Sequence, residues 1–146
     1  MIGGNNLSHK EFNDINATKK LLYYHNENKQ AICSLKDMLK NLDGKKGVNY
    51  DGMPGSSGTG DPTGNIAIKR ARLEIKLKNT ERIVSIVDKA LDMLPDVERE
   101  IVEKKYIQGY TWTQITISCS YSRGGALKAG QRGLDKVRQA LFGVKL

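Results

Sequence analysis

Hydrophobic residues in the first third of the chain recur at steps of three and four. The recurring positions are Phe12, Ile15, Leu22, Ile32, Leu35, Leu39 and Leu42. This spacing places them on one face of a helix. Ser8 and Glu11 have the spacing of a capping box, which indicates a helix start near Ser8. We predict a helical region over residues 1–43, either one long amphipathic helix or two shorter ones broken near "HNENKQ".

A glycine- and proline-rich segment follows. Residues 42–65 include "DGMPGSSGTGDPTGN", a composition that excludes a regular helix or a central strand. The segment lacks the Lys-Ser/Thr pair of a phosphate-binding loop, and no strand pattern precedes it. We predict a loop or linker over residues 44–65, with Asp61 as the N-cap and Pro62 as the first residue of the next helix.

The next segment predicts a long helix over residues 66–91. Hydrophobic positions follow a 4-3-4-3-4 repeat that includes Thr80, as in helices packed side by side. Two interpretations stay open: an oligomerisation surface, or an intramolecular hairpin against the first helix. The seam consists of Leu73, Leu77, Val84, Val87 and Leu91. Both interpretations can hold together, because a second stripe runs along Ile75, Ile83, Ile86 and Ala90.

The last third predicts two short helices and a longer basic one. The first begins at Pro95, has acidic residues in its first turn and stops at Gly109. Its expected apolar face is Val97, Ile101, Val102 and Tyr106. The second, "TWTQITIS", has Thr111 and Gln114 in capping-box spacing and Ile115 facing inward. With the basic third helix, this arrangement predicts an all-α protein whose residues 92–146 form a helix-turn-helix domain.

The third helix is predicted from about Ser122 to Leu141. Its expected buried stripe is Ala126, Gly130, Gly133, Leu134, Val137 and Leu141. Each interior glycine costs about 1 kcal/mol of helix propensity relative to alanine. Gly130 and Gly133 therefore either let the helix pack closely against its neighbour or leave it loose until DNA orders it. Because both fall on the inward stripe, we favour close packing.

The net charge of +8 is concentrated near the C-terminus. Residues 117–146 hold 6 basic and 1 acidic side chains, whereas residues 1–116 are nearly balanced. Such an excess suits contact with a polyanion, although a solvated basic face would give the same count.

The spacing of the cysteines and the hydropathy of the chain bear on metal binding and on the cellular compartment. Cys33 and Cys119 lie far apart without metal-ligand spacing, so we expect two buried free thiols and no metal site. No apolar run is long enough for a membrane span, and the N-terminus has no signal-peptide core. We expect a cytoplasmic protein without a membrane partner or a cofactor.

Residues 91–142 resemble region 4 of the sigma-70 factors. The matching motif is "LPDVEREIVEKKYIQGYTWTQITISCSYS" followed by a helix that ends "LDKVRQAL". The upstream "DGMPGSSGTGDPTGN" and "IAIKRARLE" resemble the linker of the ArpU/RinA-type regulators of phage late transcription. Two departures stand out: Gln114-Ile115-Thr116 replaces the usual Glu-Ile-Ala, and glycines interrupt the recognition helix.

The resemblance implies a sequence-specific DNA-binding regulator, a phage or prophage late-gene activator that works as an oligomer in the bacterial host, at the nucleoid. The chain has only nine scattered aromatic residues and no promoter-melting domain, so it is not a complete sigma factor. Contact with host RNA polymerase is left open.

We expect double-stranded DNA to contact the third helix and the turn before it. Arginine and glutamine can make bidentate contacts to base edges. The expected major-groove residues are Arg123, Lys128, Gln131 and Arg132. The expected phosphate contacts are Thr111, Thr113, Tyr121, Ser122, Lys136 and Arg138. Trp112 is interpreted as a packing residue and not as a base-stacking one.

Two other classes of protein stay open. A small terminase subunit also joins a helix-turn-helix to an oligomerising hairpin, and would form a ring. A helical assembly protein would use the seam and ignore DNA. An enzyme is not expected, because His9 and His25 have no paired nucleophile and no plausible metal set.

Overall fold

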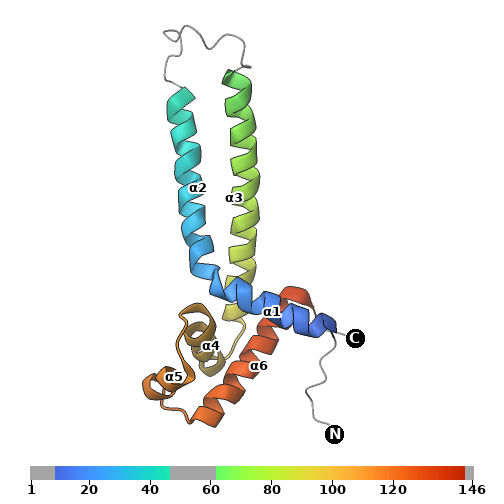
Figure 1. Ribbon diagram of the computed structural model, residues 1–146, viewed down its shortest axis with the longest axis vertical. Helices are drawn as coiled ribbons and strands as arrows, with labels where there is room; N and C mark the ends of the chain where they lie inside the picture. The colour runs from blue at the N-terminus through green and yellow to red at the C-terminus, as the bar shows by residue number, and fades with distance from the viewer. Residues whose placement is uncertain (1–8, 47–61, 144–146) are drawn as a thin grey trace. The chain divides into compact units, whose positions relative to one another are not determined.

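The computed structural model describes residues 9–46 and 62–143, and every element in these ranges is helical (Figure 1). This confirms the all-α prediction. The elements are α1 (His9–Tyr23), α2 (His25–Lys46), α3 (Pro62–Asp92), α4 (Asp96–Val102), the π-helix η2 (Glu103–Ile107), α5 (Trp112–Ser118) and α6 (Arg123–Phe142).

The N-terminal region forms two helices, α1 and α2, which separate at Tyr24 just before the "HNENKQ" stretch. Helix α2 reaches further into the glycine-rich segment than predicted, since it continues through Lys46, whereas α3 begins at Pro62 as predicted. A lone glycine in a last turn costs only about 1 kcal/mol, and proline fits the first turn of a helix. The rest of the predicted linker, and the caps predicted at Ser8 and Asp61, lie outside the described residues.

The packing divides the chain into two compact units. The first contains the residues up to Asn26 and those from Val84 onward, and the second contains Glu27–Ile83. These boundaries differ from the domains predicted to end at residues 43, 65 and 91. Helix α1 and the end of α3 belong with the C-terminal helices, because their apolar faces are buried against them.

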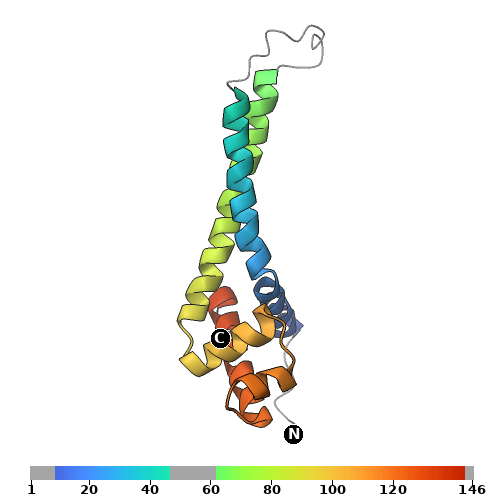
Figure 2. The same ribbon diagram turned by 90° about the vertical axis from the view of Figure 1, so that its left-hand side faces the viewer.

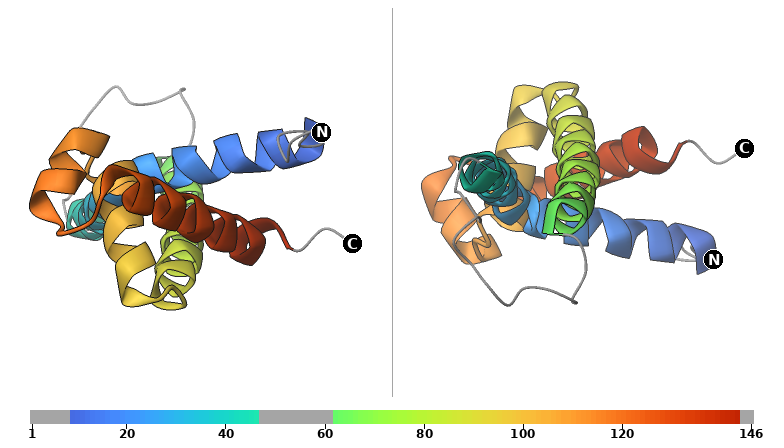
Figure 3. Two further views of the ribbon diagram at one scale, coloured as in Figure 1. Left: turned by 90° about the horizontal axis from the view of Figure 1, so that it is seen from below. Right: turned by 90° about the horizontal axis from the view of Figure 1, so that it is seen from above.

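Two apolar clusters hold the first unit together. The larger one is formed by Leu22, Val87, Ala90, Leu91, Leu94, Val102, Leu134 and Val137. Helix α1 lies alongside α6 here (Figure 3). The smaller cluster lies among α4, α5 and α6 (Figure 2) and is formed by Ile101, Ile115, Cys119, Ala126 and Ala129. Full burial of each valine, leucine or isoleucine stabilises the fold by roughly 1.5–3 kcal/mol.

A buried histidine joins the start of α2 to α3 within the first unit. His25 is 2% exposed, and its Nε2 donates a hydrogen bond to Asp88 Oδ1 at 2.8 Å. Its Nδ1 is buried without a hydrogen-bond partner in the described structure. The position of His25 inside the packing makes it a structural residue.

The second unit is an antiparallel pair formed by α2 and α3 (Figures 1 and 2). Of its described residues, only Leu35 is buried, with 5% of its surface exposed. Leu73 and Leu77 of the predicted seam are half-buried here, and Arg70 forms an ion pair with Asp43 between the two helices. The second unit is therefore thinly packed, with much of its apolar surface exposed.

The C-terminal part of the seam is buried in the first unit, where Val84, Val87 and Leu91 are 8%, 0% and 3% exposed. These three side chains pack inside the protein, as in the intramolecular interpretation. The prediction that the seam forms an oligomer surface would require Val87 and Leu91 to leave this core.

The cysteines split between two environments. Cys119 is buried as predicted, but Cys33 is exposed, so the expectation of two buried thiols was wrong for Cys33. Its position on α2 lies off the face that carries Leu35. No group of three or more potential metal ligands occurs among the described side chains. No helix within residues 9–46 and 62–143 is long and apolar enough to cross a membrane.

Candidate nucleic-acid interface

The α5 helix begins with a complete capping box. The backbone N of Gln114 donates to Thr111 Oγ1 at 3.1 Å, and the backbone N of Thr111 donates to Gln114 Oε1 at 2.9 Å. Gly109 has a φ of +78°, a conformation that favours glycine, and it permits the turn between η2 and α5. Ile115 is fully buried. The predicted cap and inward residue are therefore confirmed.

The α6 helix is also capped as expected, because the backbone N of Gly125 donates to Ser122 Oγ at 3.1 Å. Its predicted inward stripe is confirmed, with Leu141 half-buried at the end. Ala129 and Arg138 are buried as well. One side of α6 is thus packed, and the other side faces outward.

The inward glycines make close contacts. A Cβ on Gly130 would lie 2.8 Å from Trp112 Cη2 and 3.2 Å from Ile101 Cγ2. A Cβ on Gly133 would lie 2.6 Å from Val102 Cγ2 and 3.3 Å from the backbone O of Glu98. These contacts support the close-packing interpretation: Gly133 meets α4 alone, and Gly130 meets α4 together with Trp112 of α5.

The outward face of α6 presents three uncommitted polar side chains. Arg123, Lys128 and Gln131 are exposed and make no side-chain hydrogen bond or ion pair among the described residues. Lys128, Gln131 and Arg132 are neighbours on one surface, since residues three and four apart on a helix adjoin. These are the side chains predicted to enter the major groove.

Glu98 of α4 restrains two predicted DNA contacts. Lys136 Nζ donates to Glu98 Oε2 at 2.9 Å, and Arg132 Nε donates to Glu98 Oε1 at 3.2 Å. Burial by itself would raise the pKa of Glu98, but the hydrogen bonds from Lys136 and Arg132 outweigh it and hold that pKa below its usual value. Glu98 is 5% exposed, whereas both cations remain largely exposed. The Glu98 carboxylate therefore orients the Arg132 and Lys136 side chains and neutralises part of their charge.

Arg138 does not fit its predicted phosphate-binding role. Its side chain is 9% exposed, and Nη2 and Nε donate to Asp135 Oδ1 at 2.8 and 3.1 Å. The charge of Arg138 alone predicts a place on the basic face, but Asp135 on the same helix pairs with it. The guanidinium is committed to Asp135 within α6.

The remaining predicted phosphate contacts cluster at the N-terminal ends of α5 and α6. Thr111, Thr113 and Ser122 are exposed, and Tyr121 is half-buried against the smaller cluster. Thr111 and Ser122 accept cap hydrogen bonds, so each hydroxyl keeps its own proton to donate to a further acceptor.

Lys104 forms a polar network that sequence reasoning missed. Its Nζ donates to Glu100 Oε1 at 3.2 Å and lies 3.4 Å from both Ser118 Oγ and Cys119 Sγ. The hydrogen bond from Lys104 lowers the pKa of Glu100, and the same bond raises the pKa of Lys104. The network fixes the end of α5 to α4 and η2. Only the i,i+4 spacing of Glu100 and Lys104 was visible in the sequence.

Trp112 is a packing residue, as predicted. It is half-buried against the smaller cluster, and Lys105 Nζ lies 5.1 Å from the centre of its ring. The cation makes a favourable contact with the face of the indole.

A second cationic surface within the first unit was also missed. Lysines and tyrosines of α1, η2 and the Tyr24 junction surround a shallow depression of about 310 Å³. The lining residues are Lys19, Lys20, Tyr23, Tyr24, Lys105 and Tyr106. Burial raises the pKa of Tyr106. Residues so distant in the sequence gave no signal that they would meet.

The chain matches no known protein-family model, no curated protein and no solved structure. The resemblance to sigma region 4 and to phage late-transcription regulators accordingly stays a prediction, carried by the motifs themselves.

Proposed function

We propose that this protein binds double-stranded DNA in a sequence-specific manner through α6 and regulates transcription. The observation that carries the proposal is the contrast between the two sides of α6. One side is packed through Gly130 and Gly133, whereas the other presents Arg123, Lys128 and Gln131, which have no partners within residues 9–46 and 62–143. Arginine, lysine and glutamine are the side chains that bond base edges in the major groove.

The packing of α4, α5 and α6 supports this role. A capped short helix followed by a tight turn and a capped longer helix is the arrangement that holds a recognition helix against DNA. Arg132 is oriented by Glu98, so less side-chain ordering remains to be done on binding. The finer proposal of a phage or prophage late-gene activator acting as an oligomer rests on the sequence resemblance.

The test is selection of bound fragments from the source genome with the full-length chain. The full chain is the appropriate sample because Leu22 and Val87, outside residues 92–146, belong to the core of the first unit. Enrichment of one sequence near a late promoter supports the regulator. Absence of any enriched sequence contradicts sequence-specific binding.

One observation favours the alternative of a small terminase-like or assembly protein. The second unit is thinly packed and exposes several isoleucines, as a contact surface for another chain would. A ring-sized particle in sedimentation, together with fragments from a packaging origin, would favour the terminase-like role.

A further inference from the structure

The outer face of α3 in the second unit carries an exposed apolar stripe. Ile68, Ile75 and Ile83 are 52%, 61% and 37% exposed. Steps of seven and eight residues place them on one face of the helix. They extend over about 22 Å, the length of a helix of about four turns. A stripe of this size on the exposed face of a helix is typical of a contact surface.

Cations border the stripe along both edges. Helical spacing places Lys69 and Lys76 along one edge and Lys78 and Arg82 along the other, while Arg72 lies on the same face as the isoleucines, between Ile68 and Ile75 along the helix axis. All five are exposed, and none forms an ion pair within the part of the chain that the structure describes. The acidic residues of this stretch, Glu74 and Glu81, lie on the far side of the helix.

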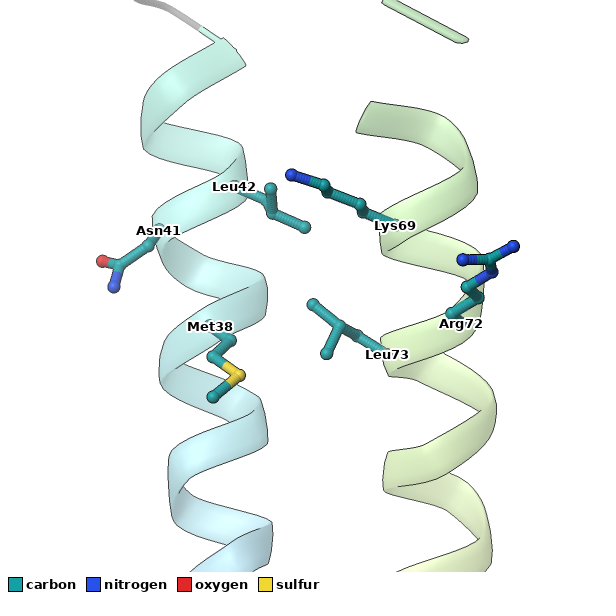
Figure 4. Close-up of a pocket in the computed structure, with 6 residues that line it drawn as sticks. All are labelled: Met38, Asn41, Leu42, Lys69, Arg72 and Leu73. Carbon is teal, nitrogen blue, oxygen red and sulfur yellow. The ribbon is translucent and has the colours of Figure 1, made fainter. Parts of the chain in front are cut away.

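An apolar groove adjoins the same cations. It has a volume of about 420 Å³, and its apolar lining comes from Met38, Leu42 and Leu73. Leu42 of α2 and Leu73 of α3 point toward one another, and Lys69 extends toward α2 (Figure 4). Lys69 and Arg72 also line the groove, so the same two cations border both apolar surfaces.

We propose that this face of α3 binds an acidic amphipathic helix of a partner protein. Apolar side chains of the partner would cover the isoleucine stripe, and its carboxylates would pair with the five bordering cations. Flanking charges of this kind decide which helices pair. A second copy of the same face is disfavoured in either direction, because cations would then face cations along both edges.

The direct test measures binding of two labelled peptides to the full-length chain by fluorescence anisotropy. Both peptides have about three heptads with leucine at the core positions; one carries glutamate and the other lysine at the flanking positions. The glutamate peptide should bind, and its affinity should fall at least about tenfold between about 0.05 and 0.5 M salt. The lysine peptide should not bind. Equal binding of the two peptides, or binding of neither, overturns the proposal.

Matched variants locate the site. Ile68→Ser with Ile75→Ser should lower the affinity for the glutamate peptide at least about tenfold, since the double substitution removes two apolar contacts. Ile117→Ser is the control, because Ile117 is 81% exposed on α5 and should leave peptide binding unchanged. Arg72→Glu with Lys76→Glu keeps the apolar stripe and should weaken the preference for the glutamate peptide, because three cations then remain beside two new carboxylates. An unchanged preference in that variant contradicts the proposal.

Other occupants give distinct results. A second copy would appear as a dimer in sedimentation that Ile68→Ser with Ile75→Ser dissolves. Duplex DNA as the occupant would appear as loss of DNA binding in Arg72→Glu with Lys76→Glu, because phosphates would be held by these cations. Either result overturns the helix-partner proposal. DNA binding through α6 is measured separately, so failure of one proposal leaves the other intact.

Discussion

Gly133→Ala should destabilise the protein although alanine is the better helix former. The added Cβ would lie 2.6 Å from Val102 Cγ2, well inside the roughly 3.5–4.0 Å of a favourable carbon contact. It would also lie 3.3 Å from the backbone O of Glu98. Neither neighbour can move easily, because Val102 is fully buried with a stiff β-branched side chain and the other atom is backbone.

Two opposing effects set the size of the change. Alanine gains about 1 kcal/mol of helix propensity over glycine. Overpacking in a core costs typically about 1–3 kcal/mol, and contact with two rigid neighbours favours the upper end. The expected net loss for Gly133→Ala is therefore about 1–2 kcal/mol. Gly130→Ala should be nearer neutral, because the half-buried Trp112 ring can shift, and the double variant should melt below the parent protein.

Urea unfolding followed by circular dichroism measures the effect. Gly124→Ala is the matched control in the same helix, because its Cβ would meet no heavy atom within 4 Å. It should leave stability unchanged or raise it by up to about 1 kcal/mol. If the Gly130→Ala, Gly133→Ala double variant is more stable than the parent protein, close packing is refuted. The glycines would then loosen α6 instead.

Four further substitutions test the site and the core. Glu98→Gln should lower the free energy of unfolding at neutral pH by roughly 1–3 kcal/mol. The pKa of Glu98 is lower in the folded protein than its usual value, so the parent should have its full advantage over the variant at pH values above that usual value. The advantage should disappear as the pH falls through the lowered pKa of the folded protein. Urea unfolding at several pH values checks this, and a pH-independent difference contradicts it. Arg123→Ala should cost about 1–3 kcal/mol on the preferred DNA site and relax discrimination, whereas Lys136→Ala should weaken all sequences about equally. Identical behaviour of the two in competition binding rejects the division of contacts. His25→Ala should cost about 1–3 kcal/mol in urea unfolding, since it removes a buried hydrogen bond to Asp88, and unchanged stability would contradict a structural role.

Features that depend on neighbouring residues could be predicted from the sequence. The capping box at Thr111, the turn at Gly109 and the inward stripe of α6 follow from local spacing and glycine chemistry. Local spacing therefore predicts the helix-turn-helix candidate and the exposure of most of its polar residues. Val97 was an exception, because periodicity placed it inward but it is 39% exposed at the start of α4.

Features that depend on how distant segments meet could not be predicted. Glu98 lies 34 and 38 residues from its partners Arg132 and Lys136, so only the packing of α4 on α6 shows that it restrains them. The packing of α1 beside α6 and the exposure of Cys33 likewise depend on tertiary arrangement. Periodicity identifies the apolar face of a helix but does not say which other helix packs against it.

The most direct measurement of the central claim is the salt dependence of DNA binding by the full-length chain. The logarithm of the affinity for a selected duplex should fall linearly with the logarithm of the salt concentration, with a slope of about −0.9 for each phosphate neutralised. Lys128→Ala removes an exposed cation that has no partner among the residues that the structure describes, and it should weaken binding and reduce that slope by no more than about 1. A flat salt response, or a slope and affinity that Lys128→Ala leaves unchanged, would contradict DNA binding through the outward face of α6.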